Sequence, residues 1–95
     1  MSGYRINRQL TEFGEHVRGW RMVLGLTAQQ VSERAGITRD TLRKIESGNP
    51  NVSFNSVTQV LRALGILDQL VDAADPLASD IGRLRAGRLT RKRAR

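Results

Sequence analysis

The sequence predicts an all-α fold, with five helices in one small domain and a basic C-terminal arm. Apolar residues recur at intervals of three and four along most of the chain, as they do on one face of an amphipathic helix. No segment alternates polar and apolar residues over the length of a strand. We expect the domain to span residues 9–75 and the arm to span residues 76–95.

The first helix is expected at about residues 11–24. Its inward stripe consists of apolar residues spaced by four, three and four positions: Phe13, Val17, Trp20 and Leu24. Gly14 and Gly19 weaken the helix by roughly 1 kcal/mol each relative to alanine, so tertiary packing must hold it. Gly25 then ends the helix as a C-terminal glycine.

Two short helices follow, joined by a glycine turn. Thr27 and Gln30 have the spacing of a capping box, which places the start of the second helix at Thr27. Gly36 supplies the positive φ of a tight turn, Thr38 caps the third helix, and Gly48 ends it. The residues expected to face inward are Val31, Ala35, Ile37, Leu42 and Ile45.

The last two predicted helices carry broad apolar faces. Ser53 is expected to cap the fourth helix, which ends before Gly65. The fifth helix is expected at residues 66–74, and the Asp75-Pro76 pair stops it. The inward residues expected here are Phe54, Val57, Val60, Leu61, Leu64, Leu67, Leu70 and Val71.

The composition excludes several classes of protein. The chain has 95 residues, no cysteine and one histidine, so disulfide scaffolds, thiol nucleophiles and cysteine-bound zinc are excluded. No phosphate-binding loop, nucleophile elbow or paired carboxylates are present, so we expect no catalytic residues, no metal site and no cofactor. No apolar run is long enough to cross a membrane and no signal-peptide pattern is present, so we expect a cytoplasmic chain that binds no membrane.

The net charge of +7 indicates an anionic partner, with nucleic acid the leading candidate. The charge is unevenly placed: residues 1–47 carry +3, residues 48–82 carry −3, and the whole excess lies at the C-terminus. The basic residues of this end are Arg83, Arg85, Arg88, Arg91, Lys92, Arg93 and Arg95. Residues 1–82 are therefore formally neutral, and residues 83–95 are strongly basic.

Two short helices around a glycine-centred turn form a helix-turn-helix. The run LTAQQVSERAGITRDTLRKIESG (residues 26–48) closely resembles the helix-turn-helix of the Cro/C1-type, or xenobiotic-response-element, regulator family. The resemblance extends from about Phe13 through Leu70. It implies a lambda-repressor-like domain that binds double-stranded DNA as a transcriptional repressor, commonly as a homodimer on an inverted repeat.

A second resemblance begins at Gly48. The run GNPNVSFNSVTQVLRALGI (residues 48–66) is similar to the same stretch of HipB-type antitoxins. Such proteins repress their own promoter and bind a HipA-like kinase toxin. The rival interpretation from another class is therefore a toxin-neutralising protein-binding module in which DNA binding is secondary.

The resemblance assigns base reading to the third helix. The matching positions are Thr38, Arg39, Asp40, Arg43 and Lys44. Arg39 suits direct readout, because a guanidinium can donate two hydrogen bonds to guanine O6 and N7. Asp40 has two interpretations: it accepts from cytosine N4, or it stabilises the positive end of the helix dipole.

Polar residues at helix starts and loops are expected to bind phosphates. These candidates are Thr27, Gln29, Ser47, Asn49 and Asn51. Ala28 departs from the family, which usually has a polar phosphate-binding residue there. The resemblance also implies a structural ion pair between Arg21 and Glu46, largely inside the domain.

The basic arm has three interpretations. It follows DNA phosphates or enters a minor groove, or residues 79–88 fold as a helix on a protein partner, or it is a solvated segment. Composition does not separate these uses.

Overall fold

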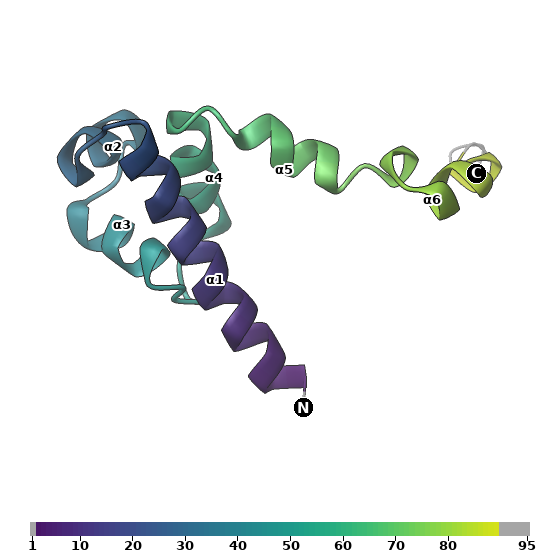
Figure 1. Cartoon of the computed structure of the whole chain (residues 1–95), viewed down its shortest axis with the longest axis horizontal. Coiled ribbons are helices and arrows are strands. Elements are labelled where there is room, and N and C mark those ends of the chain that lie inside the picture. The colour runs from purple at the N-terminus through teal and green to yellow at the C-terminus, as the bar shows by residue number, and fades with distance from the viewer. Residues whose placement is uncertain (1, 90–95) are drawn as a thin grey trace.

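The computed structural model describes residues 2–89, and all regular structure within this range is helical (Figure 1). The all-α prediction is confirmed. The helices are α1 (Ser2–Val23), α2 (Ala28–Ala35), α3 (Arg39–Glu46), α4 (Phe54–Ala63), α5 (Leu67–Ala73), the 3-10 helix η1 (Pro76–Ala78) and α6 (Asp80–Leu84). Two more elements are present than the five expected, because the side chains of Asp75 and Ser79 cap short helices beyond the predicted domain.

Helix α1 begins nine residues earlier than the sequence predicted. Ile6 and Leu10 extend the stripe of Phe13 and Val17 towards the N-terminus at intervals of four and three. The first turns of α1 extend well past the other helices (Figure 1), and Ile6 is exposed there. The apolar face of α1 is thus longer than the body that covers it.

The fully buried core is formed by α1 to α4 and by Leu64 at the end of α4, and Leu67 and Leu70 of α5 pack against it while partly exposed. The buried apolar residues are Val17, Val31, Ala35, Leu42, Ile45, Val60, Leu61 and Leu64. Ser32 is also buried, and its hydroxyl donates to the Ala28 carbonyl oxygen at 2.8 Å, which satisfies it within its own helix. Arg62 ties α4 to α2, since its Nη2 donates to the Arg34 carbonyl oxygen at 2.7 Å.

Four residues predicted to face inward are exposed: Trp20, Leu24, Phe54 and Val71, the last because the far side of α5 is not covered by the body. Trp20 and Leu24 were expected to continue the stripe of α1, but Arg21 takes the inward position four residues after Val17, because it pairs with Glu46. Phe54 is 73% exposed. It is the first residue of α4, where Ser53 as N-cap turns the first side chain away from the core.

Side-chain caps define the helix starts as predicted. Thr27 Oγ1 accepts from Gln30 N at 3.0 Å and Gln30 Oε1 accepts from Thr27 N at 2.9 Å, so the capping box is complete. Thr38 and Ser53 cap α3 and α4 in the same way. The turns that follow α1 to α4 each contain a glycine with φ between 70° and 79°: Gly25, Gly36, Gly48 and Gly65.

Two glycines let α1 cross closely over the end of α3. A Cβ on Gly14 would lie 2.6 Å from the Glu46 carbonyl oxygen and 2.7 Å from that of Ile45. A Cβ on Gly48 would lie 2.6 Å from the Leu10 carbonyl oxygen. Gly14 thus lowers the intrinsic stability of α1, but its lack of a side chain is what allows the two helices to cross this closely.

The C-terminal segment, residues 67–89, leaves the body. Helices α5 and α6 extend to one end of the long axis, and α2 and α3 lie at the other (Figure 1). Neither α5 nor α6 contains a buried residue. Among the described residues, no helix is both long and apolar enough to span a bilayer.

Candidate nucleic-acid interface

Helix α3 is buried on one side and charged on the other. Leu42 and Ile45 lie in the core. The charged residues predicted to read bases are all exposed: Arg39, Asp40, Arg43 and Lys44. Thr38 lies at the start of the helix, where its Oγ1 accepts from Thr41 N at 3.0 Å. The domain thus holds α3 by its apolar side and presents the charged side outward.

Asp40 joins two of these basic side chains. Its Oδ1 accepts from Arg43 Nη2 at 2.6 Å, and its Oδ2 lies 3.3 Å from Lys44 Nζ. These contacts lower the pKa of Asp40, first through the hydrogen bond from Arg43 and then through that from Lys44. The carboxylate is therefore ionised at neutral pH and stands between two cations.

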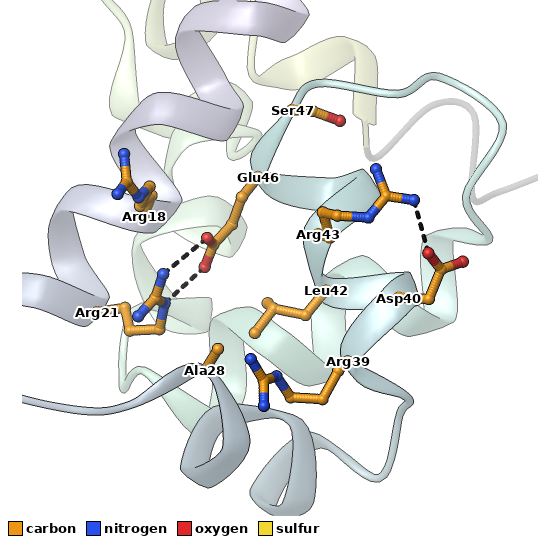
Figure 2. Close-up of a pocket in the computed structure, with 9 residues that line it drawn as sticks. All are labelled: Arg18, Arg21, Ala28, Arg39, Asp40, Leu42, Arg43, Glu46 and Ser47. Atoms are coloured by element: carbon orange, nitrogen blue, oxygen red, sulfur yellow. Dashed lines mark hydrogen bonds and ion pairs between the residues drawn. The ribbon is translucent and has the colours of Figure 1, made fainter.

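Arg39 points the other way, towards the start of α2. Its Nη1 donates to Gln29 Oε1 at 3.5 Å, a long contact, and Gln29 Nε2 donates to Glu33 Oε2 at 2.9 Å. Figure 2 shows the Arg39 side chain beside Ala28. The guanidinium is exposed and weakly held, so it can exchange this contact for a ligand.

An open groove of about 570 Å³ lies between α1, the start of α2 and α3. Arg18 of α1 faces Arg39 and Arg43 of α3 across it, and Ala28 and Leu42 form part of its wall (Figure 2). The sequence interpretation did not include Arg18. A signal was present, because Arg18 lies one turn before Arg21 and so shares its side of α1.

Arg21 and Glu46, predicted to pair, are in contact at the back of this groove. Arg21 Nε and Nη2 donate to the two carboxylate oxygens of Glu46 at 2.8 and 2.9 Å (Figure 2). Only 15% and 11% of the two side chains are exposed. The hydrogen bond to Glu46 raises the pKa of Arg21 above its usual value. The pair fixes α3 against α1 and leaves no charge of its own for a ligand.

The predicted phosphate-binding residues form two groups. Thr27 and Gln29 lie at the start of α2, and Gln29 also contacts Arg39. Ser47 lines the groove, whereas Asn49 and Asn51 lie on the loop after α3, where Asn49 Oδ1 accepts from Asn51 N at 2.7 Å. All five are exposed.

The basic C-terminus is not brought to this groove within the described residues. Arg83 is bound to Asp80, and its Nη1 donates to the Leu77 carbonyl oxygen at 2.9 Å. Helix α6, which contains Arg83 and is followed in the sequence by Arg85 and Arg88, lies at the far end of the long axis from α3 (Figure 1). Arg91, Lys92, Arg93 and Arg95 are outside the described residues. Over residues 2–89, no group of three or more histidine, aspartate or glutamate side chains is placed to hold a metal ion.

Comparison with known proteins gives a consistent result. The pattern of the helix-turn-helix domain family matches residues 12–74. An uncharacterized HTH-type transcriptional regulator of Methanothermobacter thermautotrophicus is 39% identical over 49 residues, which cover 52% of this chain and 71% of that protein. No solved structure matches the chain significantly.

Proposed function

Because this chain belongs to the helix-turn-helix domain family, we propose that it is a sequence-specific DNA-binding transcriptional repressor of the Cro/C1 type. The observation that carries the proposal is the placement of α3. Its outward side holds four charged residues, its inward side is core, and its end is fixed to α1 by the Arg21–Glu46 pair. A helix held this way fits the width of a DNA major groove.

Within this proposal α3 reads bases and its surroundings bind phosphates. Arg39 donates two hydrogen bonds to a guanine, while Thr38, Arg43 and Lys44 contact neighbouring bases. The phosphate contacts come from Thr27, Gln29, Ser47, Asn49 and Asn51. Arg18 joins them, since it faces the same groove from α1 and compensates for the missing polar side chain at Ala28.

We further propose that the repressor acts as a homodimer on an inverted repeat. Helix α5 supports this, because it has no buried residue and exposes Val71 to solvent. Leu67 and Leu70 of this seven-residue helix pack against the core but stay partly exposed, so a second copy that covers the rest of its apolar side would stabilise it further. A two-fold dimer would place two copies of α3 about one turn of DNA apart.

The function is tested by selection from a random duplex library with the full chain. The proposal predicts one enriched inverted repeat, with half-sites about 10 base pairs apart. Arg39→Ala should lose about 1–3 kcal/mol of discrimination at one position of each half-site and leave binding to random duplex nearly unchanged. If no sequence is enriched, the proposal is wrong. If Arg39→Ala weakens both kinds of binding equally, Arg39 is a phosphate contact.

A second candidate function is toxin neutralisation by the C-terminal segment. Its support is the position of α6, which contains Arg83 and precedes Arg85 and Arg88, at the other end of the long axis from α3 (Figure 1), together with the exposure of Ile81 and Leu84 on α6. An apolar and basic surface of this kind suits a protein partner better than the same DNA half-site. The test is co-expression with a toxic HipA-like kinase that the chain rescues, the first to try being any such kinase that a neighbouring gene encodes. A chain truncated after Asp75 should then fail to rescue growth while it still binds DNA.

A further inference from the structure

The charged side of α3 contains one acid among its bases. Asp40 contacts both Arg43 and Lys44, at 2.6 and 3.3 Å, while Arg39 turns away towards Gln29. Among the described acids, Asp40 alone lies within salt-bridge distance of two basic residues. All three side chains are exposed, so the cluster contributes little to folding and is available to a ligand.

This arrangement opposes contacts with phosphates. Non-specific DNA binding depends on the number of cations that pair with phosphates, each of which adds about 0.9 to the slope of log affinity against log salt. To pair with a phosphate, Arg43 or Lys44 must give up its contact with Asp40. The Asp40 carboxylate then lies close to the negatively charged DNA backbone, which repels it. Base edges in the major groove present hydrogen-bonding groups without a full negative charge, so they impose a smaller repulsion.

We propose that Asp40 is a positioning residue that holds the tips of Arg43 and Lys44 over the base-facing side of α3 and so lowers binding to non-cognate DNA. The inference rests on the proposed DNA-binding function and adds to it the source of discrimination. Asp40 is then neither a direct base acceptor nor only a partner of the helix dipole. It increases specificity by destabilising the complex with non-cognate DNA, which is one general route to specificity.

The test compares two isosteric substitutions in the full chain. Asp40→Asn removes the charge between Arg43 and Lys44. Asp80→Asn makes the same change of net charge at an exposed acid on α6, which lies far from α3 (Figure 1), and it likewise removes the partner of an arginine. Each protein is titrated with a random-sequence duplex and with the selected operator by fluorescence anisotropy at several salt concentrations. Thermal unfolding of each variant shows that it is folded.

With Asp40→Asn we expect the affinity for random duplex to rise about tenfold at 100 mM salt and the salt slope to steepen by about 1 to 2. Operator affinity should stay within about threefold, so the specificity ratio falls about tenfold. Asp80→Asn should change neither the specificity ratio nor the salt slope. Asp40→Glu keeps a carboxylate at the same (i, i+3) and (i, i+4) spacing and should restore most of the ratio.

Other outcomes overturn the inference in distinguishable ways. If Asp40→Asn matches Asp80→Asn on random duplex, the cluster has no effect on discrimination. If operator binding alone is lost, Asp40 is a direct base acceptor. If the wild-type chain enriches no operator, the proposed function fails, while the random-duplex titration still decides the role of Asp40. If neither the wild-type chain nor Asp40→Asn binds any duplex, both the DNA-binding proposal and the role of Asp40 are wrong.

Discussion

Helix α4 of the body, which comprises α1 to α4, and helix α6 of the C-terminal segment, residues 67–89, begin with the same kind of serine cap, but the two regions differ in what holds them. Ser53 Oγ accepts from Ser56 N at 3.1 Å at the start of α4, and Ser79 Oγ accepts from Gly82 N at 3.1 Å at the start of α6. The body buries eight apolar residues, whereas α5 and α6 bury none. The serine caps therefore mark where these two helices start, whereas burial of apolar side chains determines which helices unfold cooperatively.

Ion pairs follow the same division. The Arg21–Glu46 pair of the body joins residues 25 positions apart and is mostly shielded from water. The Arg83–Asp80 pair of α6 is local, and the Asp80 side chain is 99% exposed. Only the first pair connects two helices, so only it contributes to the tertiary fold.

The largest contrast is expected for leucine truncation. Leu42→Ala removes a side chain that is 1% exposed and should lower the free energy of unfolding by about 2–5 kcal/mol. Leu84→Ala, at a position 84% exposed, should change it by less than about 0.5 kcal/mol. Urea denaturation followed by circular dichroism measures both. A loss above 1 kcal/mol for Leu84→Ala would show that α6 is packed in solution.

The two ion pairs provide the next contrast. Arg21→Met keeps the apolar stem but leaves Glu46 without its partner, so we expect a loss of about 3 kcal/mol, the lower end for buried pairs. Arg83→Met should leave the unfolding curve unchanged, because its pair is exposed and local. Chemical denaturation at pH 7 measures both variants. Equal losses would contradict the division between the regions.

Glycine substitution within α1 tests the crossing with α3. Gly14→Ala should destabilise the domain by about 1–3 kcal/mol, because its Cβ meets two backbone oxygens that no side-chain rotation can move. Gly19→Ala has nothing within 4 Å of the added Cβ and should stabilise α1 by about 0.5–1 kcal/mol. Thermal unfolding should therefore shift in opposite directions. A gain in both would mean that α1 and α3 lie further apart.

The serine caps give a smaller effect. Ser53→Ala removes the cap of α4 and should cost about 1 kcal/mol in global unfolding, because α4 supplies part of the core. Ser79→Ala removes a cap of equal length and should leave global unfolding unchanged, although amide exchange in α6 should become faster. Hydrogen exchange with mass spectrometry separates the local effect from the global one.

The smallest effect is expected for truncation after Asp75, which tests the proposed boundary between residues 9–75 and 76–95. Neither η1 nor α6 contains a buried residue, so the midpoint of urea unfolding at fixed protein concentration should change little. A large decrease would place the arm inside the cooperative unit. Truncation after Gly65, which also removes α5, provides the comparison because α5 packs against α4 through Leu67 and Leu70.

The parts of the fold that depend on near neighbours in the sequence were predictable. The capping box of Thr27 and the positive-φ turn at Gly36 follow from residue types at fixed short spacing. The start of α1 was missed, because no capping residue marks it and the stripe through Ile6 lies outside the body. Trp20 was misplaced for a different reason: the inward position belongs to Arg21, whose partner is 25 residues away.

The candidate interface divides in the same manner. The exposed charges of α3 follow from its periodicity, since Leu42 and Ile45 fix the opposite side. The groove beside Arg18 depends on how α1 crosses α3, which is a tertiary feature that spacing within one helix does not contain. The contacts of Asp40 with Arg43 and Lys44 could have been predicted from their (i, i+3) and (i, i+4) spacing. The family resemblance instead implied that these residues contact bases.

The close crossing at Gly14 also makes α1 a lever. Twelve residues of α1 precede this pivot, and at 1.5 Å per residue they form a rigid arm of about 18 Å. A displacement of about 1 Å at the N-terminal tip turns the helix by about 3° at the pivot, where it touches the end of α3. A force on the first turns of α1, exerted for example by a bound surface or a fused protein, would therefore change the angle at which α3 is held without contact at the groove.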